Sequence, residues 1–198
     1  MHDDALSPTT TPPPSDNRPG YTGMWVGITA ELFEFSFFFA AYFATRWSFP
    51  EVFRESAPRL WTGGGLLITI TMLTSGYFLV RTVQAVRENN QRAARCWMLA
   101  AFFVALCYPL LKYLEIRYNL SHGVNPRGQA FFTVYYYLTI NHFMHSTWGI
   151  FGMVWVLIRI FQGAYGPGNL KAVESMAIYW HATDLVWLML FSMFYAFV

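Results

Sequence analysis

Five long apolar runs follow one another along the chain, separated by short polar stretches. They extend from about Gly23 to Thr45, Thr62 to Val80, Cys96 to Ile116, Gln129 to Phe161, and Glu174 to the C-terminus. A helix of about 20 apolar residues crosses the hydrocarbon core of a membrane. Runs of this length must be helical in lipid, because an open strand would leave its backbone polar groups unpaired. We therefore predict an all-α fold, an integral membrane bundle of five transmembrane helices.

The composition agrees with a membrane protein that has almost no soluble part. Only 12% of the 198 residues are charged and 55% are hydrophobic, whereas soluble domains carry about 25% charged residues. The net charge of +2 is too small to argue for nucleic acid or for an acidic partner. We predict a multi-pass membrane protein that does not bind nucleic acid.

The first 20 residues differ in character from the rest. They are rich in Pro, Thr and Asp and contain no apolar core, so they do not form a signal peptide. We predict a disordered polar tail over residues 1–20 and one five-helix transmembrane domain over residues 21–198.

Basic residues between the apolar runs bear weakly on orientation. With the N-terminus inside the cell, seven Lys and Arg residues lie inside and six outside. The second connection is the densest in arginine, with Arg81, Arg87, Arg92 and Arg95. Since cytoplasmic loops are enriched in Lys and Arg, this density favours a cytoplasmic N-terminus.

Acidic residues interrupt the first apolar run. A charged side chain at mid-membrane costs at least about 2.5–3.5 kcal/mol, so each must have a partner, a neutral form or access to water. Glu31 and Glu34 lie three residues apart, on one helical face. They are either proton-exchanging or lipid-contacting carboxylates, or neutral groups that join helices by hydrogen bonds. Two carboxylates this close in low dielectric rarely both ionise, so we expect at least one to hold a proton.

The fourth apolar run carries a histidine pair. His142 and His145 share one helical face, with Thr139 and Asn141 nearby. Two histidines at this spacing can ligate a metal. Intramembrane histidines also form hydrogen bonds across helix interfaces. The pair alone does not decide between the two.

Two further pairs have the same three-residue spacing. His181 and Asp184 follow Trp180 in the fifth run. They are either a proton relay or a metal ligand with its supporting acid, or a structural pair that neutralises two buried polar groups. Lys112 and Glu115 lie near the end of the third run, where an ordinary interfacial ion pair explains them.

Four stretches together resemble subunit III of the haem-copper oxidase superfamily, over roughly residues 23–198. They read GMWVGITAELFEFSFFFAAYF, LLKYLEIRY, YYYLTINHFMHSTWG and YWHATDLVWLMLFSMFY. The residues that match family positions are Glu31, Glu115, Thr139, His142, His145, Gly149, Tyr179, Trp180, His181, Asp184 and Trp187. The four motifs also occur in the order that the family has.

The resemblance departs from the larger family members in two respects. Those members have seven helices, and this chain lacks the first two, so a complete lipid-filled cleft is not expected. Ile140 stands where a Gly is usual. Short five-helix relatives occur among bacterial quinol oxidases, actinobacterial oxidases and proteins associated with nitric oxide reductases. The stretches FFAAYFATRWSFPEVF and AFFTVYYYLT are most similar to the last group.

The resemblance implies a non-catalytic accessory subunit in a bacterial inner membrane. Such a subunit has no catalytic residue, metal ligand or cofactor of its own. It packs against a haem-containing catalytic subunit that can also hold copper, stabilises it, binds phospholipid and supports proton uptake. The partner reduces either oxygen or nitric oxide. Glu31 and Glu34 are then the proton- or lipid-linked residues. The structural polar helix contacts are Glu115, His142, His145, Trp180, His181 and Asp184.

Two other functions compete with this one. A free-standing metal or proton transporter would use His142, His145, His181 and Asp184, but we find no inverted repeat or pair of interrupted helices. A membrane-embedded metal-dependent oxidase or desaturase would need several histidines around an open metal position. The chain has five histidines in all, which is few for that chemistry.

Overall fold

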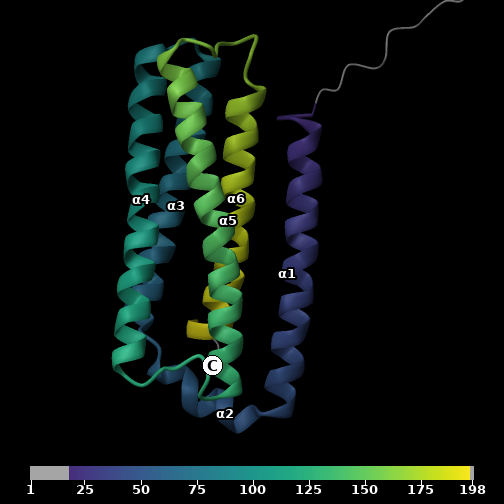
Figure 1. Cartoon of the computed structure of the whole chain (residues 1–198). Helices are drawn as coiled ribbons and strands as arrows, with labels where there is room; N and C mark the ends of the chain where they lie inside the picture. The colour runs from purple at the N-terminus through teal and green to yellow at the C-terminus, as the bar shows by residue number, and fades with distance from the viewer. Residues whose placement is uncertain (1–17, 197–198) are drawn as a thin grey trace, which may run out of the picture.

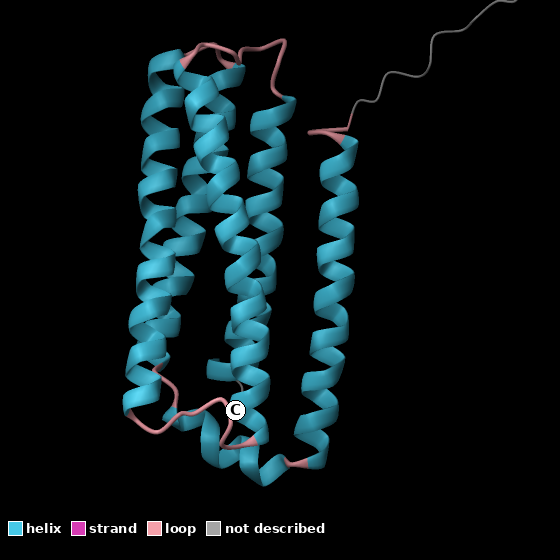
Figure 2. Cartoon of the chain, viewed as in Figure 1, coloured by secondary structure: helices cyan, strands magenta, loops and turns pink. Residues whose placement is uncertain are grey.

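The computed structural model describes residues 18–196, which form a bundle of long helices without any strand (Figures 1 and 2). Five helices are long and apolar enough to cross a membrane. They are α1 (Thr22–Ser48), α3 (Thr62–Arg87), α4 (Gln91–Ser121), α5 (Ala130–Phe161) and α6 (Lys171–Phe191). A π-helical turn, η2 (Ser192–Ala196), continues α6. The predicted all-α fold with five membrane-spanning helices is confirmed.

A short helical segment that we did not predict joins α1 to α3. It consists of α2 (Pro50–Ser56) and the 3₁₀ turn η1 (Ala57–Arg59). Pro50 begins α2, where its fixed φ suits a helix and its missing N–H is not needed. Phe53 is buried, and the Ser56 hydroxyl donates to the Gln129 side chain over 2.6 Å. These contacts hold α2 against the start of α5.

The helices extend further than the apolar runs. All four arginines assigned to the second connection lie in α3 or α4, and the turn between these helices contains only residues 88–90. Asn89 adopts a positive φ of 57°, which Asn tolerates better than most residues. The Asn90 side chain then caps α4 by accepting from the Ala93 N–H. Similarly, Lys112 was counted with the third connection when Lys and Arg were assigned to the two sides of the membrane, but it lies within α4. Polar helix ends resemble loops in sequence because they extend past the apolar core.

The connections lie at two opposite ends of the bundle (Figure 1). The start of α1, the α3–α4 turn and the α5–α6 loop share one end, while α2, the α4–α5 loop and the C-terminal end share the other. The α3–α4 pair is the most extensively packed, whereas α1 stands at the edge and packs against α5 and α6.

The predicted polar tail lies mostly outside the described residues, which begin at Arg18. The end of the predicted tail, with the residue that follows it, is held against α6. The Gly20 N–H donates to a Glu174 carboxylate oxygen over 3.2 Å, and the Tyr21 N–H donates to the Ser175 hydroxyl over 2.8 Å. These bonds fix the start of α1 to the start of α6.

Candidate functional site

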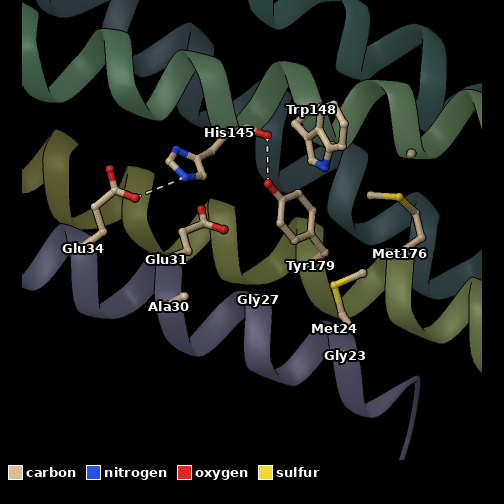
Figure 3. A pocket seen from close by; sticks show the side chains of 12 residues that line it. Gly23, Met24, Gly27, Ala30, Glu31, Glu34, His145, Trp148, Met176 and Tyr179 are labelled. Atoms are coloured by element: carbon tan, nitrogen blue, oxygen red, sulfur yellow. Dashed lines mark hydrogen bonds and ion pairs between the residues drawn. The ribbon is translucent and has the colours of Figure 1, made fainter.

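A cavity of about 450 Å³ separates α1 from α5 and α6 (Figure 3). We call it the α1 pocket. On the α1 side the cavity is lined by the small residues Gly23, Gly27 and Ala30. Trp148 of α5 and Met176 of α6 lie on the opposite side. Glu31, Glu34, His145 and Tyr179 also line the cavity. The α1 pocket is therefore mostly apolar, with its polar groups gathered at one end.

Glu31 is the most buried polar residue of the α1 pocket. It is 4% exposed, and neither carboxylate oxygen has a hydrogen-bond partner among the described residues. The Thr183 hydroxyl lies nearby but donates to the Tyr179 carbonyl over 3.1 Å. Glu31 lies nine residues into α1, or about 14 Å along its axis, close to the middle of a hydrocarbon core about 30 Å thick. The structure leaves this mid-membrane carboxyl group unsatisfied.

Glu34 has a different environment, although it shares the helical face of Glu31. A Glu34 carboxylate oxygen lies 3.6 Å from His145 Nε2, and both side chains are partly exposed. His145 Nδ1 donates to the Asn141 carbonyl over 3.0 Å, because a carbonyl can only accept. A hydrogen bond between Nε2 and Glu34 therefore requires a proton on one of these two groups. The Tyr179 hydroxyl donates to the His145 carbonyl and so ties α6 to the same place.

His142 lies on the side of α5 that faces the bundle interior, where it is fully buried. Its Nε2 donates to the Thr183 carbonyl over 3.2 Å, since that oxygen cannot donate. The Tyr108 hydroxyl then donates to Nδ1 over 3.0 Å. Both ring nitrogens are thus engaged in bonds that join α4, α5 and α6. His142 thus forms polar contacts between helices, whereas His145 lies beside Glu34.

The closing motif places Trp180 against α5, and the pair of His181 and Asp184 against α3. Trp180 is fully buried, and its ring lies against α5 at Gly149, where an added Cβ would be 3.1 Å from the indole. His181 Nδ1 lies 3.5 Å from an Asp184 carboxylate oxygen. The predicted contact between imidazole and carboxylate is therefore present, and the pair lies against α3 at Gly76.

Lys112 and Glu115 form an ion pair, but it is buried inside the bundle and is not an ordinary exposed pair. The two atoms are 2.8 Å apart, and the side chains are 1% and 0% exposed. The Tyr135 hydroxyl donates to Glu115 over 2.9 Å, and the Tyr195 hydroxyl donates to the same carboxylate oxygen. Lys112 also lies 5.2 Å from the centre of the Tyr135 ring. The pair is buried because tyrosines from α5 and η2 close over it.

Sequence reasoning missed three members of this cluster, namely Asn119, Tyr135 and Tyr195. The Asn119 side-chain amide donates to the Tyr135 hydroxyl over 3.3 Å, and its oxygen accepts from the backbone N–H of Trp61 over 3.2 Å. Asn119 follows Glu115 by four residues and so shares its helical face, a signal that could have found it. The tyrosines come from distant segments, and nothing local in the sequence indicates their role.

The four residues of the transporter hypothesis do not share a site. His142 faces Tyr108, His145 faces Glu34, and the pair of His181 and Asp184 faces α3. In the part of the chain that the structure describes, no three His, Cys, Asp or Glu side chains are close enough together to hold a metal ion.

Curated proteins similar to this chain are named as third subunits of cytochrome c oxidases and quinol oxidases. A probable cytochrome c oxidase subunit 3 of Mycobacterium tuberculosis is 27% identical over 181 residues, which cover 90% of this chain and 89% of that protein. A probable quinol oxidase subunit 3 of Staphylococcus aureus is 24% identical over 173 residues, 87% of this chain and 86% of that protein.

A third relative is longer. A heme-copper oxidase subunit I+III of Aeropyrum pernix is 27% identical over 183 residues, which cover 88% of this chain and 22% of that protein. No protein-family profile matches the chain. The resemblance to subunit III found in the four motifs is confirmed by these relatives, at modest identity over most of the chain.

Proposed function

We propose that this chain is the non-catalytic third subunit of a membrane haem-copper oxidase complex, in which haem and copper belong to the catalytic partner. The observation that carries this proposal is the similarity to oxidase third subunits over nearly the whole chain. The geometry supports it as well. His142, Lys112 and Glu115 use their polar atoms in contacts between helices, as an accessory subunit requires, rather than presenting them to a substrate.

The partner is proposed to be a haem-containing subunit I. The name of the Aeropyrum protein joins subunits I and III in one chain, and our chain matches 22% of it. Such a partner fits the isolated bundle, which exposes many large apolar side chains, among them Phe33, Trp47 and Trp155. We take oxygen as the substrate of the complex, because the three relatives are named as oxidase subunits. A nitric oxide reductase partner remains the alternative favoured by the stretches FFAAYFATRWSFPEVF and AFFTVYYYLT.

The α1 pocket is proposed to bind phospholipid and to link Glu31 to proton uptake. Its apolar walls, formed by Met24, Trp148 and Met176, suit acyl chains. Glu31 is a mid-membrane carboxyl group without a partner, which is the environment in which such groups are most often functional. Through these two features the subunit would stabilise its partner and support proton entry.

The N-terminus is proposed to lie in the cytoplasm of a bacterial cell, with the chain in the inner membrane. Counting Lys and Arg gave seven on the N-terminal side and six on the other. Lys112 belongs to the six but is buried in an ion pair, so it contributes no surface charge. The N-terminal side then has seven Lys and Arg residues and the other side five, a difference that favours a cytoplasmic N-terminus.

Affinity purification of the tagged chain in mild detergent tests this proposal. We expect haem absorbance in the visible spectrum and a large haem-copper subunit in the eluate, whose sequence would distinguish oxygen from nitric oxide as substrate. A colourless protein without a partner, carrying one metal ion per chain, would instead support the transporter. A tagged but unrelated five-helix membrane protein from the same cells is the control for adventitious haem.

A further inference from the structure

His181 and Asp184 lie on the side of the bundle where α6 meets α3. The His181 side chain is 44% exposed, while the Asp184 side chain is 5% exposed. His181 lies ten residues into α6, or about 15 Å along its axis, which is near the middle of the hydrocarbon core. An imidazole at this depth therefore faces the surface of the isolated subunit, where lipid tails would surround it.

This pair is incompletely satisfied. Both Asp184 carboxylate oxygens lack a hydrogen-bond partner within residues 18–196, although His181 Nδ1 is 3.5 Å from one of them. No hydrogen bond joins His181 Nε2 to another residue of the described part of the chain. A polar group left unpaired in an apolar medium costs several kcal/mol. Lipid tails have no donor or acceptor to reduce that cost.

The other partly exposed polar pair at this depth is different. Glu34 and His145 face each other over 3.6 Å, and His145 also bonds to the Asn141 carbonyl. Both ring nitrogens of His145 thus have a neighbour within residues 18–196. His181 differs, because its Nε2 has no hydrogen-bond partner there and its side chain is 44% exposed.

The backbone of α3 leaves room for the pair of His181 and Asp184. Gly76 is the residue opposite, and an added Cβ there would lie 2.7 Å from the Asp184 carboxylate and 2.9 Å from the His181 ring. The absence of a side chain at residue 76 therefore allows the pair to lie close against α3.

A groove leads from His181 to the membrane surface. It encloses about 590 Å³ between α3 and α6, with Val80, Val83 and Ile178 on its walls. At its upper end Arg87 and Glu174 form an ion pair over 3.1 Å. Gln84 and Glu88 line that end as well, so half of the lining residues are polar or charged. Apolar walls thus separate His181 from a polar end at the membrane surface, a pattern that a transmembrane helix with one central polar residue can complement.

We propose that this α3–α6 groove is the docking surface for a transmembrane helix of the catalytic subunit. That helix carries a hydroxyl or amide side chain that forms a hydrogen bond with His181 Nε2. This inference deepens the function proposed above and depends on it, because the groove has an occupant of this kind only if the chain is an accessory subunit. Interhelical hydrogen bonds of this type contribute about 1–2 kcal/mol in model membranes.

Site-specific photo-crosslinking in the intact complex tests the proposal. A benzoylphenylalanine would replace Val80 or Ile178 in the groove and, as matched controls, Phe151 or Trp155, which are exposed on α5. We expect both groove positions to cross-link to the catalytic subunit and both α5 positions not to. Haem content of each eluate is measured before irradiation.

These two measurements separate the possible failures. If haem co-purifies but the cross-links to the catalytic subunit come from α5, the groove proposal is overturned and the proposed function stands. If no haem co-purifies with the unmodified chain, both are overturned.

Substitution of His181 supplies a second readout that a purely structural role would not give. We expect H181F to bind the catalytic subunit about tenfold more weakly, the size of one lost interhelical hydrogen bond. H181Q, which keeps a donor and an acceptor, should recover most of the affinity. Equal loss in H181F and H181Q, with both chains folded by circular dichroism, would contradict a hydrogen bond to the partner.

Discussion

Lys112→Met would break the buried ion pair within α4, which tyrosines of α5 and η2 contact. The lysine and Glu115 are 1% and 0% exposed and 2.8 Å apart. Removing one partner of a buried pair costs about 3–5 kcal/mol, because the remaining charge is left uncompensated. Two tyrosine hydroxyls still donate to Glu115, so we place the expected loss near the lower end, about 3 kcal/mol.

A matched control exists in the same chain. Arg54 and Glu51 have the same three-residue spacing and a short contact of 2.6 Å, but their side chains are 77% and 67% exposed. Exposed pairs contribute at most about 1 kcal/mol. Arg54→Met should therefore change the free energy of unfolding much less than Lys112→Met, although both remove one cation from a close pair.

The double variant separates electrostatics from packing. Replacing Lys112 by Met and Glu115 by Leu removes both charges while nearly conserving volume, and such replacements of buried pairs are often neutral or stabilising. The hydroxyls of Tyr135 and Tyr195 lose their acceptor, at a cost of about 1–3 kcal/mol. The double variant should therefore be no less stable than Lys112→Met alone.

Unfolding of the purified chain in mixed detergent micelles, followed by tryptophan fluorescence, measures these free energies. The reasoning is refuted if Lys112→Met and Arg54→Met lose the same stability. It is also refuted if the double variant is less stable than Lys112→Met by several kcal/mol. Either result would mean that the charge on Glu115 is not what the lysine compensates.

Three further predictions concern other contacts. Gly149→Val should lower stability by about 1–3 kcal/mol through overpacking, since an added Cβ lies 3.1 Å from the Trp180 ring, whereas Gly27→Val meets nothing within 4 Å and should be nearly neutral in the same unfolding assay. Trp187→Phe removes the 2.9 Å hydrogen bond to the Thr69 hydroxyl and should cost about 1 kcal/mol or more; an unchanged free energy of unfolding would contradict this. Glu31→Gln should leave haem co-purification intact and lower the turnover of the complex, and undiminished turnover would contradict a proton-linked role.

Most of the fold could be predicted from the sequence because membrane spans follow from one dominant property. The apolar runs are long enough to allow only helices in lipid. The ends and short elements could not be placed in the same way. Residues such as Arg87 and Arg92 continue the helices into polar surroundings, where hydropathy no longer distinguishes helix from loop. The segment Pro50–Ser56 is too short to have a clear pattern of its own.

The candidate site could be predicted only as far as contacts are local. Pairs at three-residue spacing, such as His181 with Asp184 and Lys112 with Glu115, were found because helix geometry places them on one face. Partners on other helices were not. Tyr195 reaches Glu115 from 80 residues away in sequence, and its role depends on where the continuation of α6 into η2 places it beside α4. The burial of Lys112 was missed for the same reason.

The polar groups of this bundle differ in how far the chain satisfies them by itself, and this difference has physical meaning. His142 and Glu115 have their hydrogen-bonding atoms engaged inside the fold, so they stabilise the subunit whether or not anything is bound. Glu31 and Asp184 do not, although burying them unpaired opposes folding. Replacing them with apolar residues would remove this cost if they had no role. Their presence therefore agrees with the two proposals above, in which a proton or lipid at the α1 pocket and a helix of the catalytic subunit at the α3–α6 groove supply the partners that residues 18–196 do not.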